Sequence, residues 1–166
     1  MQHIAAWNLG SMSRELIIKL LDRESVDRAF PLACLSASGL SLEEWRRFAH
    51  GSPEPPGSAH GVLSIQNRSG VIQGLCSYRF ETSLRHGRVC VAEDLVALDL
   101  MDDTCVADAL LRALEDLARR GGAAALRLNL PGQSPSGDRL IARLRGRGHR
   151  WESVGLVKEL GTIPRS

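Results

Sequence analysis

The sequence predicts an α/β fold, in which helices and strands alternate along the chain. The first observation is the stretch Arg88–Leu128, whose pattern is that of a strand, a loop, a helix and a second strand in one unbroken unit. The second is the order of patterns over the whole chain, which is β, α, α, β, β, β, α, β, α, β. Such an alternation favours a sheet covered by helices.

Length and composition are those of one globular domain. The chain has 166 residues, 43% of them hydrophobic and 24% charged, which excludes disordered and collagen-like classes. We expect a single domain over residues 1–166, with an irregular extension over 1–13. The net charge of +2 is too small to predict a nucleic-acid partner. A small molecule or a peptide end is the better expectation.

The chain shows neither a membrane-spanning pattern nor a metal-binding one. No apolar run reaches the ~20 residues of a membrane helix, and no signal peptide precedes the first predicted strand, so we expect a cytoplasmic protein without a membrane partner. The 4 cysteines form no C-x-x-C pair, which predicts free thiols and no metal site.

The N-terminal region predicts a strand and a helix. Leu16–Leu21 is a short apolar run, and Asp22 after it can cap a helix over Arg23–Ser36. Pro31 is expected to kink or split that helix, because proline lacks an amide donor and clashes with the preceding turn.

A second, shorter helix is predicted by the spacing of Ser41 and Glu44, which is that of a capping box. Its apolar side carries Leu42, Trp45 and Phe48. The segment between His50 and His60 is dense in proline, glycine and serine and is expected to be a mobile loop.

The middle of the chain predicts a β-hairpin and a central strand. Two β-type runs, GVLSIQN and VIQGLCSYRF, are separated by the turn residues Arg68, Ser69 and Gly70. Gly87 opens a third strand, and Val89–Leu98 is apolar on both alternating faces, as in a strand covered on both sides.

The C-terminal part predicts two more helices and two more strands. Thr104 can cap a helix with an apolar stripe made of Val106, Leu110, Ala113, Leu114 and Leu117. The remaining predicted elements are a strand at Ala123–Leu130, a helix at Asp138–Arg147 and a strand at Trp151–Leu160.

Two adjacent acids, Glu93 and Asp94, interrupt the central apolar strand. A carboxylate between Val91 and Leu95 would lose hydration, which raises its pKa and makes it a competent base. Strand alternation would place Asp94 on the opposite face from Glu93. The other interpretation is that one or both acids pair with a nearby arginine or cap a neighbouring loop.

The chain resembles the GNAT family of acyl-CoA-dependent N-acyltransferases from about Leu16 to Leu160. The matching pieces are VIQGLCSYRF, AEDLVALDLM, ADALLRALEDLARRGGAAALRL and RLIARLRGRGHRWESVGLVKEL. The resemblance implies a mixed sheet of about six or seven strands with helices on both faces. It also implies that the strands before and after the main helix diverge from each other, and that acetyl-CoA binds between them.

The resemblance assigns roles to particular residues. Glu93 matches a glutamate that many members use as general base, and the backbone N–H of Ala97 would donate to the thioester carbonyl. The expected cofactor-binding positions are Val96, Ala97, Leu98, Thr104, Cys105, Val106, Ala107, Asp108 and Asn129.

The chain departs from the family pattern at several positions. Asp102 and Cys105 stand where the pyrophosphate loop has a cation or amide and a glycine, so we expect weakened binding of CoA. Asp102 and Asp103 could equally serve as acidic residues at a helix start. Leu144 stands where a tyrosine often protonates the leaving thiolate, and His149 is expected in an exposed turn.

Two functions follow from the sequence. The favoured one is an acyltransferase that moves an acetyl or similar group from acyl-CoA to a small-molecule or peptide amine. The alternative is a degenerate member of the fold that acts as a binding or regulatory module. The resemblance also allows a homodimer.

Overall fold

The computed structural model describes residues 16–50, 60–98, 105–130 and 135–152. It divides into two compact units, residues 1–131 and 132–166, which we treat separately. The first unit contains β1 (Leu16–Leu20), α1 (Val26–Ser36), α2 (Leu42–His50), β2 (His60–Asn67), β3 (Ile72–Ser83), β4 (Gly87–Ala97), α3 (Cys105–Arg120) and β5 (Ala125–Leu128); the second contains α4 (Pro135–Gly146).

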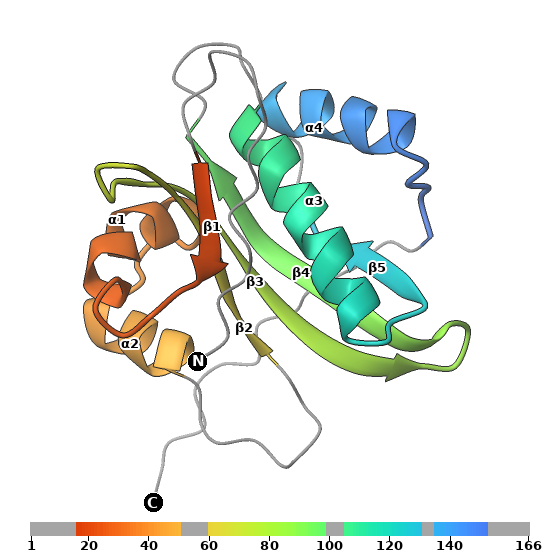
Figure 1. The fold of residues 1–166 in the computed structure, drawn as a ribbon, viewed down its shortest axis with the longest axis horizontal. Coiled ribbons are helices and arrows are strands. Elements are labelled where there is room, and N and C mark those ends of the chain that lie inside the picture. Colours follow the sequence, from red (N-terminus) through yellow and green to blue (C-terminus); the bar gives the residue numbers. More distant parts are fainter. Residues whose placement is uncertain (1–15, 51–59, 99–104, 131–134, 153–166) are drawn as a thin grey trace, which may run out of the picture. The chain divides into compact units, whose positions relative to one another are not determined.

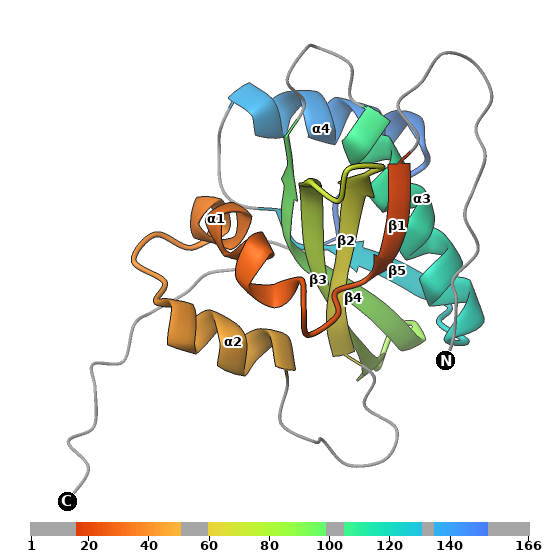
Figure 2. The ribbon, with the colours of Figure 1, turned by 60° about the vertical axis from the view of Figure 1, so that its left-hand side comes forward.

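The described strands form one mixed sheet in the order β1-β2-β3-β4-β5 (Figure 1). The strands β1 to β4 pair antiparallel, and β5 pairs parallel to β4. The parallel pair is joined through α3, as expected for strands that need a crossover connection. In Figure 2, α1 and α2 lie on one face of the sheet and α3 lies on the other. The predicted α/β class with helices on both faces is therefore confirmed.

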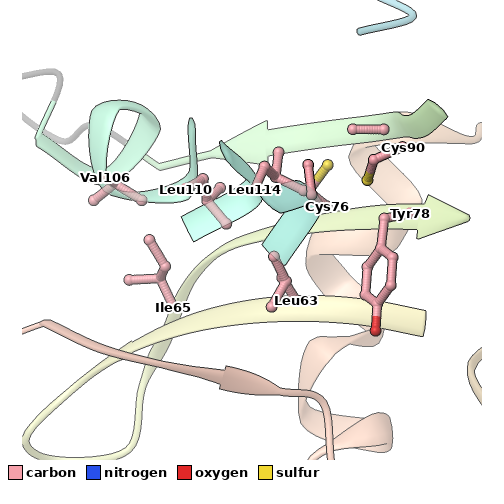
Figure 3. Close-up of a cluster of buried hydrophobic side chains, with 10 residues drawn as sticks. Leu63, Ile65, Cys76, Tyr78, Cys90, Val106, Leu110 and Leu114 are labelled. Carbon is pink, nitrogen blue, oxygen red and sulfur yellow. The ribbon is translucent and has the colours of Figure 1, made fainter. Parts of the chain in front are cut away.

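On the α3 face, apolar side chains of the helix pack onto those of the three central strands (Figure 3). Leu110 and Leu114 are fully buried there, as the predicted apolar stripe requires. The strand residues in this core are Leu63, Ile65, Cys76, Tyr78, Cys90 and Ala92.

On the opposite face, α1 and α2 pack against parts of β2, β3 and β4. Val26, Ala29 and Trp45 are buried against Val62 and Leu75. The Trp45 ring N–H donates to the carbonyl of Val26 at 2.7 Å, which joins the two helices. The sheet is thus shared by two apolar cores.

Most of the predicted elements are confirmed, with shifted ends. Helix α1 begins at Val26 rather than Arg23, because the Asp22 carboxylate accepts from the backbone N–H of Ser25 at 2.8 Å and closes a turn before the helix. Pro31 lies inside α1 without splitting it, so the split is wrong and the kink stays a prediction. Strand β5 is shorter than the predicted Ala123–Leu130.

The turn chemistry is confirmed at two places. Gly70 has φ +78° in the turn of the β2–β3 hairpin, a conformation that favours glycine. The capping box of α2 is present, since the Ser41 N–H donates to Glu44 at 2.9 Å and the Glu44 N–H donates to the Ser41 hydroxyl at 3.2 Å.

Several expectations fall outside the described residues. These are the extension 1–13, the loop residues 51–59, the cap Thr104 and the acids Asp102 and Asp103, and nearly all of the strand Trp151–Leu160. The described residues hold five strands, fewer than the six or seven expected. The single-domain expectation stays a prediction. None of the helices in the described residues is long and apolar enough to cross a membrane.

Candidate functional site

Strand β4 contains a bulge at its two adjacent acids. Ser77 pairs with Glu93 and Leu75 pairs with Val96, so β4 has one more residue than β3 between these pairs. Asp94 is the extra residue of the bulge, and its φ of +52° lies in the left-handed region. A bulge interrupts the alternation of side chains, and this changes the faces predicted from a regular strand.

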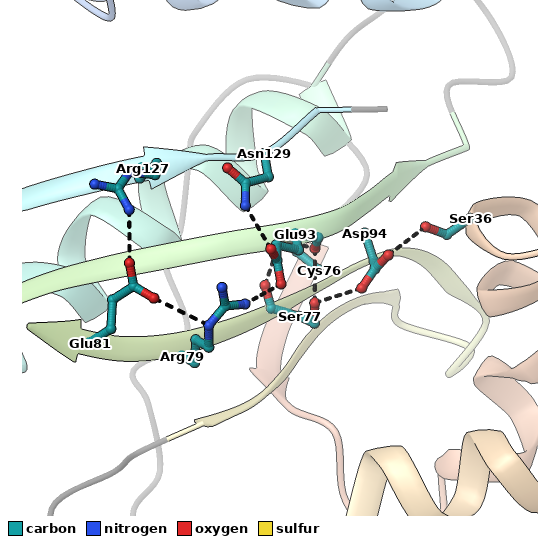
Figure 4. Close-up of polar contacts among 9 residues, drawn as sticks. All are labelled: Ser36, Cys76, Ser77, Arg79, Glu81, Glu93, Asp94, Arg127 and Asn129. Carbon is teal, nitrogen blue, oxygen red and sulfur yellow. Dashed lines mark hydrogen bonds and ion pairs between the residues drawn. The ribbon is translucent and has the colours of Figure 1, made fainter. Parts of the chain in front are cut away.

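Glu93 and Asp94 consequently lie on the same face of the sheet, the face opposite α3 (Figure 4). The expectation that Asp94 points to the other face is wrong. Leu95, which was expected beside Glu93, packs instead into the α3-side core. Alternation with the buried Cys90 and Ala92 does place Val91 on the face of Glu93.

Glu93 is held by an arginine and an amide. Its carboxylate forms a short ion pair with the guanidinium of Arg79 and accepts from the side-chain amide of Asn129 at 2.6 Å. Burial alone would raise the pKa of Glu93, but these two hydrogen bonds and the Arg79 charge outweigh it and hold the pKa below its ordinary value. The expected rise toward neutrality is therefore wrong, and pairing with an arginine is confirmed.

The ion pair belongs to a longer network across three strands. Arg79 also lies 3.5 Å from Glu81 on β3, and Glu81 accepts from Arg127 on β5 at 2.8 Å. Figure 4 shows this row from Arg127 to Asn129 along one face of the sheet. Opposite charges on neighbouring strands attract one another, so the row ties β3, β4 and β5 together.

Asp94 has different partners. One of its oxygens accepts from the Ser36 hydroxyl of α1 at 2.9 Å, and the other accepts from the Ser77 hydroxyl of β3 at 2.9 Å. Both donors are neutral. The carboxylate of Asp94 is thus oriented by a helix and a neighbouring strand, whereas the carboxylate of Glu93 is oriented by the arginine network.

Next to Asp94 lies a cavity of about 510 Å³ between α1, α2 and the sheet. Its walls are mainly apolar and include Ala33, Leu40, Trp45, Phe48, Val62 and Leu75. The acids Asp94 and Glu44 and the hydroxyl groups of Ser36 and Ser77 also line it. A mostly apolar cavity with a few converging polar groups is the usual form of a small-molecule site.

Strand β4 extends beyond the part of its edge that pairs with β5. Register pairs between β4 and β5 run from Val89–Ala125 to Ala92–Leu128, and the Asn129 N–H then donates to the Ala92 carbonyl at 2.9 Å. Strand β4 continues to Ala97, whereas β5 ends at Leu128. The last residues of β4 therefore carry backbone groups that β5 does not pair.

Ala97 directs its N–H group to this unpaired side. The N–H of Leu98 donates to Gln73 of β3 at 2.7 Å. Neighbouring residues of a strand direct their N–H groups to opposite edges, so the N–H of Ala97 is directed away from β3.

The start of α3 lies close to the same part of β4. Ala97 pairs with Gly74, and a Cβ atom on Gly74 would come within 2.8 Å of Val106 in the first turn of α3. The side chains of Val106 and Ala107 are buried, so a ligand at the start of α3 would contact their backbone N–H groups and not their side chains. Free amides at a helix start attract anions.

The other predicted positions are distributed as follows. Asp108 is half-buried, Asn129 is exposed and bonded to Glu93, and Thr104 lies outside the described residues. Tyr78 is buried in the sheet, and burial raises the pKa of its hydroxyl group.

In the second unit, Leu144 is buried and His149 is partly buried, with its Nδ1 3.2 Å from the carbonyl of Leu144. The expectation of an exposed turn histidine is wrong, because the turn folds back onto the last residues of α4.

Cys34, Cys76 and Cys90 are free thiols. In the part of the chain that the structure describes, no three His, Cys, Asp or Glu side chains are arranged to hold a metal ion.

Sequence reasoning missed Ser36 and Ser77 as partners of Asp94, and it missed the cavity. Serines carry no distinctive local pattern in a helix end or a strand. The one usable signal was an aspartate next to a glutamate inside an apolar strand, because aspartate tolerates the left-handed conformation of a bulge better than most residues do.

Comparison with known proteins identifies the fold. No family model matches the sequence, and no curated protein matches it by sequence. Among solved structures, an aminoglycoside N-acetyltransferase in complex with CoA aligns with a TM-score of 0.70 at 11% identity, over 93% of this chain and 100% of the other.

Two further solved structures align over similar lengths. Glucosamine-6-phosphate N-acetyltransferase from Arabidopsis thaliana has a TM-score of 0.66 at 18% identity, over 87% of this chain and 97% of its own. A transcriptional regulator from Bacillus halodurans C-125 has a TM-score of 0.70 at 15% identity, over 87% of this chain and 99% of its own. The chain therefore has the fold of the GNAT acetyltransferases, as the resemblance predicted.

Proposed function

We propose that the protein transfers an acetyl or similar acyl group from acyl-CoA to an amine. The observation that supports this most directly is the unpaired edge of β4 next to the first turn of α3. Ala97 directs an N–H group to that edge, and Val106 and Ala107 lie in the first turn of α3, where backbone N–H groups have no partner within the helix. Such an arrangement suits a ligand with an amide-rich arm and an anionic end.

In this proposal two segments of the chain bind different parts of acyl-CoA. The backbone from Val96 to Leu98 would bind the arm, and the amides from Cys105 to Asp108 would bind the pyrophosphate. The bound thioester supplies an activated acyl group. The N–H of Ala97 would stabilise negative charge on the carbonyl oxygen during attack, a contribution of about 10² to 10³ in rate for one such donor.

The proton balance is also assigned to this chain. The amine must lose a proton before its nitrogen forms the new C–N bond, and Glu93 is the proposed acceptor, directly or through a water molecule. Its lowered pKa keeps it ionised at neutral pH but makes it a weak base. As the C–S bond breaks, the thiolate would take a proton from solvent, because Leu144 stands where a tyrosine would donate one.

A second function, a binding or regulatory module without turnover, is favoured by one observation. Glu93 is engaged by Arg79 and Asn129, which is also what a purely structural carboxylate would show. The likeness to a structure described as a transcriptional regulator is compatible with this alternative.

Titration of the purified protein with acetyl-CoA, followed by an assay for free thiol with a panel of amines, separates these functions. We expect acetyl-CoA to bind, and more weakly at high salt than at low salt because the pyrophosphate is charged. We also expect amine-dependent release of CoA thiol. Binding of acetyl-CoA without thiol release would favour the binding or regulatory module, and no binding at millimolar acetyl-CoA would exclude the acyltransferase.

A further inference from the structure

The cavity beside Asp94 has a one-sided charge. Among the residues that line it, the ionisable ones are Asp94 and Glu44, and both are acids. The nearby cations of the same sheet face, Arg79 and Arg127, are paired with Glu93 and Glu81. An anionic ligand such as a sugar phosphate would find no cation among the described wall residues, whereas a cation would find the carboxylate of Asp94. The Glu44 carboxylate already accepts from Ser41 at the start of α2.

The walls of the cavity select for an apolar body. Trp45 and Phe48 stack with ring centroids 6.1 Å apart at one side, and Val62 and Leu75 form the floor on the sheet. Apolar surface that enters such a space leaves water at a gain of roughly 25 cal/mol per Å², and a polyhydroxylated ligand gains little of this. The volume of about 510 Å³ lies within the usual range of small-molecule sites, so an amine with an apolar ring or a short branched chain fits inside it.

Asp94 is placed at the cavity by a strained backbone. A non-glycine residue at φ +52° is uncommon, and such residues persist only where the surrounding structure holds them. Here the Ser36 and Ser77 hydroxyl groups hold one carboxylate oxygen each. Since each oxygen can accept more than one hydrogen bond, the carboxylate retains acceptor sites for an ammonium group.

We propose that the cavity binds a primary ammonium carried on a compact apolar body, such as an arylalkylamine, and that Asp94 is its counter-ion. This deepens the proposed function, because it names the class of acceptor amine. Asp94 anchors the ammonium, while the arginine-paired Glu93 lies beside it on the same face of β4.

The test compares phenethylamine with its neutral analogue 2-phenylethanol by calorimetry on the full chain. We expect the amine to bind more tightly than the alcohol. Asp94→Asn keeps the size and the hydrogen-bonding capacity but removes the charge, so amine affinity should fall by about 10- to 100-fold while alcohol affinity stays unchanged. Glucosamine, a polar amine, should bind far more weakly than phenethylamine.

Two further variants serve as a second test of Asp94 and as a control. Asp94→Gly removes the carboxylate with a residue that is at ease at positive φ, so it keeps the test valid if Asp94→Asn folds poorly. Glu43→Gln is the matched control, because this exposed acid of α2 pairs with Arg47 and lies outside the cavity walls. Its amine affinity should equal that of the unmodified protein.

Three results would overturn the proposal: no binding of phenethylamine, equal losses for amine and alcohol in both Asp94 variants, or glucosamine binding as tightly as phenethylamine. A separate titration with acetyl-CoA keeps the two proposals apart. If phenethylamine binds with the predicted Asp94 dependence and acetyl-CoA does not, acyl transfer fails and the cavity assignment stands. If acetyl-CoA binds and releases thiol only with other amines, the reverse holds.

Discussion

At the scale of single residues, one backbone angle decides how two adjacent acids differ. With a regular strand, Asp94 would enter the α3-side core, where a charged group without a partner costs several kcal/mol. The bulge turns it to the face of Glu93 instead. Glu93 then meets a guanidinium and an amide, whereas Asp94 meets two hydroxyl groups beside a cavity. Neighbours in sequence thus acquire separate roles.

The proposed role of Glu93 as base can be tested by Glu93→Gln. The variant keeps the shape and still bonds Asn129, but it removes the proton acceptor, so kcat for acyl transfer at pH 7 should drop by about 10². Affinity for acetyl-CoA should change by no more than a few fold. Because its partners lower the pKa of Glu93, the carboxylate is ionised throughout pH 6 to 9, and the unmodified rate should rise with pH as the amine loses its proton.

Arg127→Met is the control for this experiment, because Arg127 belongs to the same charged row but bonds Glu81 rather than Glu93. It should retain most of the activity. Unchanged turnover in Glu93→Gln, or equal losses in both variants, would assign Glu93 to the structure of the sheet and remove it from the chemistry.

At the scale of elements, the sequence predicted what local signals specify. The capping box of Ser41, the turn glycine Gly70 and the apolar stripe of α3 depend on residues close in sequence, and all three were found where expected. The bulge was not predicted, since it is set by how β4 pairs with β3. The partners of Glu93 come from β3 and from the end of β5, so its lowered pKa could not be read from its own strand.

Helix α2 offers a test of one such local signal. It forms one wall of the cavity. Because it has only 9 residues, its first turn depends on the cap. Ser41→Ala removes the hydroxyl that accepts from the Glu44 N–H and should cost about 1 kcal/mol. We expect a fall in melting temperature of about 2 to 4 °C for a chain of this length.

Ser69→Ala serves as the control for the cap, because Ser69 is an exposed serine in the β2–β3 turn. Its melting temperature should stay within about 1 °C of the unmodified value, as is usual for surface changes. Equal effects of the two substitutions would mean that the cap does not stabilise α2.

At the scale of the sheet-bearing unit, stability rests on one sheet with a core on each face. Strand β3 supplies Cys76 to the α3-side core and Leu75 to the other, and both side chains are fully buried. Loss of packing on one face should therefore loosen the strands that support the other. The proposed ligand sites share this dependence, because the unpaired β4 edge lies near α3 and the cavity lies under α1 and α2.

Gly74→Ala tests this coupling. A Cβ at Gly74 would come within 2.8 Å of a methyl group of the β-branched Val106 and 3.1 Å of both Leu110 and the Val96 carbonyl, and the carbonyl is part of the backbone. Such overpacking typically costs about 1 to 3 kcal/mol. If the unit unfolds cooperatively, amides in α1 as well as α3 should lose protection in hydrogen exchange by a similar factor. Gly146→Ala, where a Cβ meets nothing within 4 Å, should change neither. Loss of protection in α3 alone would mean that the two faces are stabilised independently, and the cavity beside Asp94 would then be insensitive to changes on the α3 side.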